Sequence, residues 1–258
     1  MCYDISFTVN IRAITDFFPE TVFDPQLNLE FGMADHIQGV SVFGEHPILY
    51  MNRETMQINC RPMQWSCIEF FRKEMPDMKR RNGMLNIRAE RVLNDPASYW
   101  YKIRNRRCLV PVTSIFEHRA IPGWKKKVPY AVRPRDQSVF FLAGLYSVAE
   151  LPDKTTGELV KTWTFGLITR SANSLMQQIH NDGENKHRMP LFLPLEMSKE
   201  FISDTLSPER YAAILNYEMP SADLAYHTVY TIRSPKGRPD EKGKHEAWEW
   251  ESLPELES

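Results

Sequence analysis

Alternating apolar and polar positions predict short β-strands along most of the chain. In the first third, strands are expected in ISFTV, VSVF, HPILYMN and INCRPMQWSCIEF, with turn residues between them. From residue 108 onward the segments rich in Val, Ile, Phe and Thr are CLVPVTSIFEH, VPYAVRP, SVFFLAGLYSV, KTWTFGLIT, MPLFLP and AYHTVYTI. The polar segment DKTTGE separates two of these strands and is typical of a hairpin turn.

Helices are predicted between and after these strands. Residues 11–18 form a short helix that ends at Pro19, and Asp95-Pro96 predicts the start of a helix running to about Arg104. SLMQQIH follows a Ser/Asn start at 171–174, and LEMSKEFISD and PERYAAILNY follow later. Mostly antiparallel strands with peripheral helices predict an α+β fold. We expect one domain over residues 1–233, with a closed or half-closed barrel as its core, and a loose polar tail over 234–258.

Composition narrows the class of protein. The chain has 258 residues, 42% of them hydrophobic, which suffices for a sizeable core. No apolar run approaches the roughly 18 residues of a membrane span, and the N-terminus does not have the pattern of a secretion signal. The four cysteines have neither a disulfide framework nor CxxC spacing. The sequence therefore predicts a cytoplasmic protein.

The net charge of −1 conceals an uneven distribution. Residues 72–135 hold 17 Lys and Arg against 5 Asp and Glu, and the remainder holds 15 against 28. Such a segment can supply a basic face for phosphates. Alternatively, these charges disperse over the surface or pair with acids from the two ends of the chain. The nearly neutral total argues against strong, indiscriminate binding to duplex DNA.

Cys2 has a chemistry that no internal cysteine has. Once Met1 is removed, its α-amine and thiol lie on adjacent carbons and can both attack one aldehyde, giving an imine and then a thiazolidine ring. Free α-amines titrate near 7.7–8.0, so roughly a tenth to a fifth are neutral at pH 7. On position alone, Cys2 is equally compatible with a minor packing residue near a frayed end.

Three further residues are candidates for acid/base chemistry or positioning. Glu117 ends an apolar strand, where partial desolvation would raise the pKa of its carboxyl group, although such a residue often simply faces water. Asn86 lies between Leu85 and Ile87, which suits a hydrogen bond to a reactive group or, equally, a turn or cap. His180 ends the SLMQQIH helix as a proton shuttle or as a helix cap.

Other patterns are less specific. The histidines are scattered without HExxH or Cys/His pairing, so neither a metal site nor an organic cofactor is predicted. Trp124 and Lys125 begin a segment that mixes an aromatic ring with three cations. This composition suits stacking on a base next to phosphates, but it also occurs at ordinary hairpin tips.

Taken in order, the motifs are much more specific than each alone. They are Cys2, MQWSC around Trp65, NIRAE at 86–90, Phe116-Glu117, VPY at 128–130 with FLAGLY at 141–146, LIT at 167–169, Ile179-His180 and RMP at 188–190. This series, which spans residues 2–232, resembles the SRAP family (SOS response-associated peptidase-like proteins), which process abasic sites in DNA.

The resemblance implies a role for each matching residue. Cys2, after loss of Met1, would form a thiazolidine with the open-chain aldehyde of an abasic sugar in single-stranded DNA. Asn86 would hold the amine and the ring, Glu117 would position or protonate the amine and sugar hydroxyls, and His180 would move protons. On the DNA side the expected contacts are made by Arg88, Thr169, Trp65, His118, Trp124 and Lys125. A monomer is expected.

The chain departs from the family pattern at four places. Tyr3-Asp4 stands where the family has Gly-Arg, and His118 replaces an aromatic residue. Residues 32–35 replace an Asn-Val-Ala-Pro segment. A polar insertion at about 181–186 makes His187 a competitor of His180, although His180 keeps the Ile-His pair. These departures change the expected DNA contacts and substrate more than they change the chemistry of Cys2.

Two other functions are compatible with the sequence. The family label suggests an N-terminal-nucleophile peptidase that removes its own leading residue. A divergent member could also be a non-catalytic module that binds single-stranded DNA and leaves Cys2 unused.

Overall fold

The computed structural model describes residues 2–27, 33–234 and 237–257. The strands are β1 Asp4–Phe7, β2 Val22–Phe23, β3 Ala34–Gln38, β4 Glu45–Asn52, β5 Gln57–Trp65, β6 Asn86–Arg88, β7 Arg107–Val112, β8 Ser114–Arg119, β9 Val128–Pro134, β10 Phe140–Pro152, β11 Leu159–Ser171, β12 Arg188–Pro190, β13 Phe192–Leu193 and β14 Leu224–Thr228. The helices are η1 Ile11–Asp16, α2 Met78–Asn82, α3 Ala89–Asn94, α4 Tyr99–Lys102, α5 Ser174–Ile179, α6 Leu195–Ile202, α7 Pro208–Leu215 and η2 Ser221–Asp223.

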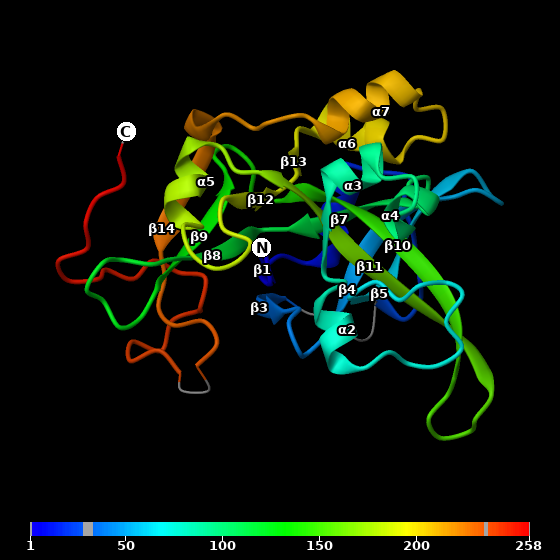
Figure 1. Cartoon of the computed structure of the whole chain (residues 1–258), viewed down its shortest axis with the longest axis horizontal. Helices are drawn as coiled ribbons and strands as arrows, with labels where there is room; N and C mark the ends of the chain where they lie inside the picture. The colour runs from blue at the N-terminus through cyan, green and yellow to red at the C-terminus, as the bar shows by residue number, and fades with distance from the viewer. Residues whose placement is uncertain (1, 28–32, 235–236, 258) are drawn as a thin grey trace.

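A closed barrel forms the centre of the molecule, as the sequence predicts. The strands follow one another in the order β11-β10-β7-β4-β5, and β5 pairs back onto β11 in parallel through Phe165 and Trp65. All other pairings around the ring are antiparallel. A second sheet, β14-β9-β8-β1-β3, lies beside this barrel, and its strand β1 lies near the middle of the molecule (Figure 1). The α+β prediction is confirmed.

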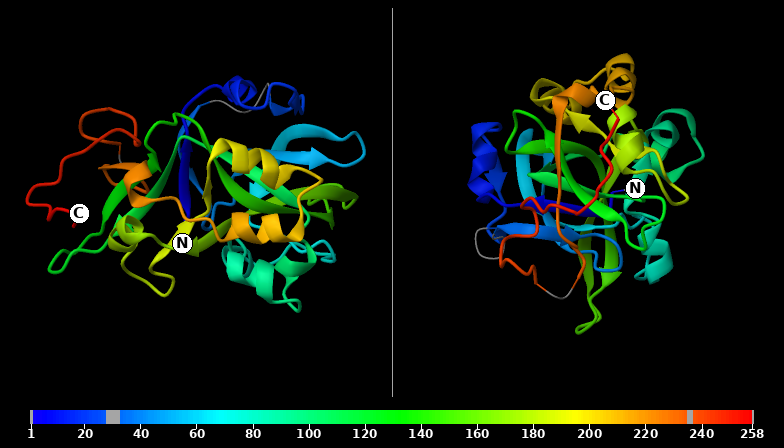
Figure 2. Two further views of the ribbon diagram at one scale, coloured as in Figure 1. Left: turned by 90° about the horizontal axis from the view of Figure 1, so that it is seen from above. Right: turned by 90° about the vertical axis from the view of Figure 1, so that its left-hand side faces the viewer.

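Both faces of the barrel strands are covered, so their sequences contain long apolar runs. Along β10, Phe140 and Leu142 belong to one buried cluster, while Phe141, Ala143 and Leu145 belong to another. The second cluster includes residues of α3, α6 and α7, which pack along the outside of the strands (Figure 2). Successive strand residues point to opposite faces, so each strand contributes to two cores.

Several boundaries differ from the predictions. VSVF is a turn, and the strand in that region is β3, immediately before it. The helix expected at Asp95-Pro96 begins instead at Tyr99, because the Ser98 side chain accepts a hydrogen bond from the Tyr101 backbone amide. The long predicted strand CLVPVTSIFEH is two strands, β7 and β8, in different sheets.

The tail is packed rather than loose over its described residues, 237–257. Trp250 donates from Nε1 to the carbonyl oxygen of Val229 at 3.0 Å, and Thr228 donates from Oγ1 to the carbonyl oxygen of Trp248 at 2.6 Å. Further along, Arg119 donates to the carbonyl oxygen of Pro254 at 2.5 Å. The two tryptophans provide the apolar area that anchors this otherwise polar segment.

Gly144 tests how tightly the barrel is packed. A Cβ atom at this position of β10 would lie 2.9 Å from the carbonyl oxygen of Gly166 and 3.0 Å from Sγ of Cys108. Gly144→Ala is therefore expected to lower the free energy of unfolding by about 1–3 kcal/mol, the usual range for overpacking, in urea titrations. Gly237→Ala, where a Cβ meets open space, is the control. Equal stability of both variants would contradict close packing at Gly144.

Candidate active site

Four residues that are distant in sequence meet at the N-terminal end of β1. β1 pairs with β8, with Asp4 opposite Phe116, which brings Glu117 to the start of the chain. β6 pairs with β11, and its first residue, Asn86, donates from Nδ2 to the carbonyl oxygen of Cys2 at 2.9 Å. His180 follows α5, and its Nε2 lies 3.9 Å from Oε2 of Glu117. The structure thus brings together Cys2, Asn86, Glu117 and His180.

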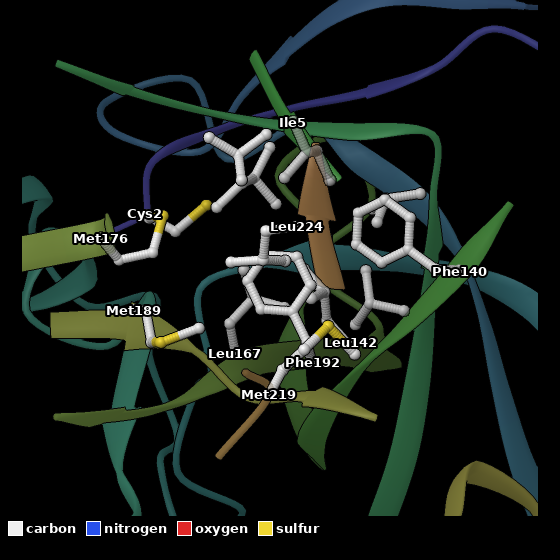
Figure 3. Packing of buried hydrophobic residues seen from close by; sticks show 14 of the residues in the cluster. Cys2, Ile5, Phe140, Leu142, Leu167, Met176, Met189, Phe192, Met219 and Leu224 are labelled. Atoms are coloured by element: carbon white, nitrogen blue, oxygen red, sulfur yellow. The ribbon is translucent and has the colours of Figure 1, made fainter. Parts of the chain in front are cut away.

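The Cys2 thiol is completely buried. It lies beside Met176 at the edge of the apolar cluster that also contains Met189 (Figure 3). Its Sγ donates to the carbonyl oxygen of Asp4 at 3.6 Å. Burial raises the pKa of the thiol well above its usual value, and the charge of Glu117 raises it further. The thiol therefore stays protonated at neutral pH.

Glu117 and His180 form a buried pair in which burial disfavours the charged form of both side chains. Burial raises the pKa of Glu117 to about 7 and lowers the pKa of His180 to about 4. The Nδ1 atom of His180 lies 2.9 Å from the carbonyl oxygen of Arg188 and 3.3 Å from its backbone nitrogen. We assign the ring proton to Nδ1 because the carbonyl oxygen is the nearer of the two partners. Near pH 7 the site therefore contains a neutral imidazole and a carboxyl group that is close to half ionised.

Two buried acceptor atoms in this group lack a hydrogen-bond partner among the described residues. They are Oδ1 of Asn86 and Oε1 of Glu117. A buried acceptor without a donor costs about 1–3 kcal/mol, so a hydrogen-bond donor placed beside these two atoms would be favoured. Both atoms therefore favour a ligand or a reacting group at this position.

A polar cavity of about 450 Å³ opens above the pair. Its lining residues are Tyr3, Glu117, His118, Lys127, His180, Asp182, Gly183, Glu184, Asn185 and Arg233. Four of them belong to the insertion predicted at about 181–186, which thus forms part of the cavity wall. The insertion is tied to the site by an ion pair of 2.7 Å between Lys127 and Asp182 and a hydrogen bond of 3.0 Å from Arg88 to Asn185.

The geometry favours His180 over His187 as the histidine of the site. His187 is exposed, has a positive φ of 59° and does not line the cavity. Its backbone amide donates to the carbonyl oxygen of His180 at 2.8 Å, which closes the inserted loop. The insertion therefore extends outward between the two histidines and leaves His180 beside Glu117.

The residues predicted to contact DNA lie in different environments. Trp65 is fully buried, stacks on Phe165 and donates from Nε1 to the carbonyl oxygen of Leu85 at 3.1 Å. Thr169 is also fully buried and donates to the carbonyl oxygen of Ile87. These hydrogen bonds give both side chains a structural role, and contact of either one with DNA stays a prediction. A sequence motif does not show this burial, because the burial depends on the closed barrel.

The other four are accessible to different degrees. His118 lines the cavity, and burial lowers its pKa to about 4. Trp124 is half-buried against Trp250 of the tail, with ring centres 6.3 Å apart. Lys125 and Arg88 are exposed. Of the segment at 32–35 that departs from the family pattern, residue 32 lies outside the described residues.

The basic segment does not form one continuous free face. Many of its cations are engaged with other parts of the chain, such as Arg107 with the carbonyl oxygens of Phe201 and Ser203, and Arg80 with Glu69. Sequence reasoning missed Arg233, which comes from beyond this segment and lines the cavity. The aspartate at position 4 departs from the family pattern, but the sequence does not show which cation pairs with it.

Comparison with known proteins connects this geometry to a family. The family model described as SOS response associated peptidase (SRAP) matches residues 1–232. Abasic site processing protein YoqW of Bacillus subtilis is 29% identical over 180 residues, covering 69% of this chain and 73% of that protein. Abasic site processing protein YoaM of the same organism is 25% identical over 224 residues, 86% of each chain.

Solved structures support the same fold. A crystal structure of a protein from Bacteroides thetaiotaomicron superimposes with a TM-score of 0.74 at 25% identity, covering 95% of this chain and 97% of that one. A protein from Bordetella bronchiseptica gives a TM-score of 0.68 at 14% identity, covering 89% of this chain and all of that one. None of the helices in the described part of the chain is long and apolar enough to cross a membrane.

Proposed function

Because the chain belongs to the SRAP family, we propose that it processes abasic sites in DNA, and that it does so by a covalent crosslink through Cys2. Relatives that cover most of the chain carry the name abasic site processing protein. The proposed substrate is a single-stranded DNA whose abasic sugar opens to an aldehyde. The crosslink requires removal of Met1, which frees the α-amine of Cys2.

The reaction is a condensation without a change of oxidation state. The amine adds to the aldehyde carbon, and loss of one water gives an imine. The thiol then adds to the imine carbon, so that a C–S bond forms and the thiol proton ends on nitrogen. The product is a thiazolidine whose mass equals protein plus DNA minus one water.

Burial of the thiol supports an order in which the amine reacts first. With its pKa raised by burial, Sγ is a poor nucleophile toward a free aldehyde at neutral pH. An α-amine is already partly neutral at pH 7. Once the imine exists, the thiol is held next to its carbon, and closing the ring is an intramolecular step. The apolar surroundings of Sγ then also protect it from other reactions.

Glu117 and His180 are suited to opening the sugar ring. The abasic aldehyde is mostly hidden as a cyclic hemiacetal, and ring opening needs one proton donated and one removed. A carboxyl group with a pKa of about 7 can donate near neutral pH, and the neutral imidazole of His180 can accept. Because the two groups are 3.9 Å apart, both can address one sugar.

The observation that carries the proposal is the pair of unpartnered acceptors beside Cys2. An α-amine at Cys2 would supply the N–H donors that Oδ1 of Asn86 and Oε1 of Glu117 lack. The test is intact-mass analysis of the Met1-free protein after incubation with an abasic single-stranded oligonucleotide. We expect a heat-stable adduct at the mass of both components minus water. Cleavage of a peptide extended ahead of Cys2, without any DNA adduct, would support the peptidase alternative instead.

Asn86→Ala is expected to slow adduct formation about tenfold. The variant loses the hydrogen bond that fixes the Cys2 backbone, and one such bond contributes about 1–1.5 kcal/mol. The measurement is the rate of adduct formation on denaturing gels. Asn59→Ala is the matched control, because Asn59 also has an unpartnered buried oxygen but lies on β5 opposite Tyr50. A similar loss in both variants would assign the effect to stability rather than to positioning.

A further inference from the structure

A second group of charged residues reaches the same cavity through Arg233 and has no part in the chemistry described above. Asp4 on β1 is 1% exposed, which is unusual for a carboxylate. His36 on β3 contacts it from Nε2 at 2.9 Å, and Arg233, beyond β14, contacts it from Nε at 3.0 and 3.1 Å. Nη2 of Arg233 makes a further close contact with Oδ2. The three residues come from three different segments of the chain.

The contacts fix Asp4 as an anion and fix the direction of Arg233. Burial alone would raise the pKa of Asp4, but the hydrogen bonds from His36 and Arg233 outweigh burial and hold that pKa below its usual value. A carboxylate that receives Nε and Nη2 of a guanidinium sets the plane of the whole group. Asp4 therefore fixes the orientation of the Arg233 guanidinium group.

Part of Arg233 remains available to a ligand. The hydrogen bonds within the described residues use Nε and Nη2, so Nη1 is unoccupied among them. The side chain is 40% exposed and lines the cavity with Glu117 and His180. Lys127, the other lining residue with a permanent positive charge, is paired with Asp182 at the rim. Arg233 is thus a pre-oriented cation beside the acid/base pair.

We propose that Arg233, held by Asp4 and His36, binds a phosphate group of the substrate next to the sugar that reacts with Cys2. The proposal rests on the proposed function for the sugar, and it adds a specificity-determining residue. A buried ion pair contributes little net stability, because desolvation offsets the attraction. Its value here is geometric, since an arginine whose orientation is already fixed loses less entropy when it binds an anion.

Two small aldehydes test the proposal without the rest of a DNA strand. The Met1-free protein is incubated separately with 2-deoxyribose and with 2-deoxyribose 5-phosphate at concentrations far below saturation, and the rate of adduct formation is followed by intact mass. We expect faster reaction with the phosphorylated sugar. Arg233→Gln should lower the rate with the phosphorylated sugar about tenfold, which corresponds to the loss of one charge-assisted hydrogen bond. The rate with 2-deoxyribose should fall by a much smaller factor, because that sugar has no phosphate for Arg233 to bind.

Two further variants separate binding from folding. Arg210→Gln is the matched control, because Arg210 is also held by a carboxylate, Glu200, and is 43% exposed, but lies on α7 away from the cavity. Arg233→Lys keeps a positive charge beside Asp4 but lacks the planar guanidinium that Asp4 orients. We expect this variant to recover part of the preference for 2-deoxyribose 5-phosphate over 2-deoxyribose. An equal loss of rate with both sugars, or no preference in the wild type, would overturn the proposal.

Binding of inorganic phosphate gives a readout that does not depend on any covalent step. In ³¹P NMR titrations, the dissociation constant should be about tenfold higher for Arg233→Gln than for the wild type or for Arg210→Gln. Absence of an adduct from either sugar would contradict the proposed function, while the phosphate titration would still decide the role of Arg233. Identical phosphate binding by the wild type and Arg233→Gln would refute that role.

Discussion

Cys2→Ala protein, incubated with an abasic single-stranded oligonucleotide, is expected to form no adduct that survives heating. The variant keeps an α-amine, so an imine can still form, but no thiol closes it to a thiazolidine. Such an imine hydrolyses when the sample is denatured. The side chain is small and lies at the edge of a large cluster, so the loss of one sulfur atom leaves the fold intact. The measurement is intact mass after denaturation.

Controls identify which group is responsible. Addition of borohydride before denaturation should recover a crosslink in Cys2→Ala, because reduction traps the imine through the amine alone. Cys67→Ala removes another buried free thiol, one that lies in the other apolar cluster, and should form the heat-stable adduct at the wild-type rate. A heat-stable adduct in unreduced Cys2→Ala would show that another nucleophile reacts, and the proposed chemistry would be wrong.

The sequence predicted the fold class because its strands are long and strongly apolar. β10 and β11, each of 13 residues and joined by DKTTGE, are clear from their composition alone. Barrel closure depends on the parallel contact between β11 and β5, which are about 100 residues apart and whose pairing leaves no local signal. The short strand β3 was missed because its residues, ADHIQ, are mostly polar and are only half-buried.

The site was predicted to the extent that its residues occur within motifs. Asn86, Glu117 and His180 belong to segments whose order is diagnostic, and the structure brings them to Cys2. The burial of Trp65 and Thr169 was not predicted, because a residue type does not show whether it points into a core or toward a ligand. Arg233 could not be identified, since its relation to Asp4 exists only after β1 and the end of β14 meet in three dimensions.

Glu117→Gln is expected to slow crosslinking on the order of 100-fold, the lower end of the usual contribution of a general acid. Two populations set the wild-type pH profile: the protonated form of Glu117, which falls as pH rises through about 7, and the neutral α-amine, which rises toward about 8. Their product peaks between these values. In Glu117→Gln the descending limb should be lost, and the rate should follow the amine alone. Affinity for undamaged single-stranded DNA should change little.

A stability measurement separates this catalytic role from a structural one. The pKa of Glu117 is about 7 in the folded protein and about 4.3 in an unfolded chain, so the folded state binds this proton more tightly. The resulting stabilisation is fully present below about pH 4.3 and is lost as pH rises through about 7. The free energy of unfolding of the wild type should therefore fall relative to Glu117→Gln across this window.

If crosslinking and DNA affinity were lost together, and the two stability curves ran parallel, Glu117 would be a structural residue with an ordinary pKa. If Glu117→Gln instead crosslinks more slowly, and its rate approaches the wild-type rate as pH rises above 7, the carboxyl group of Glu117 donates the proton that opens the sugar.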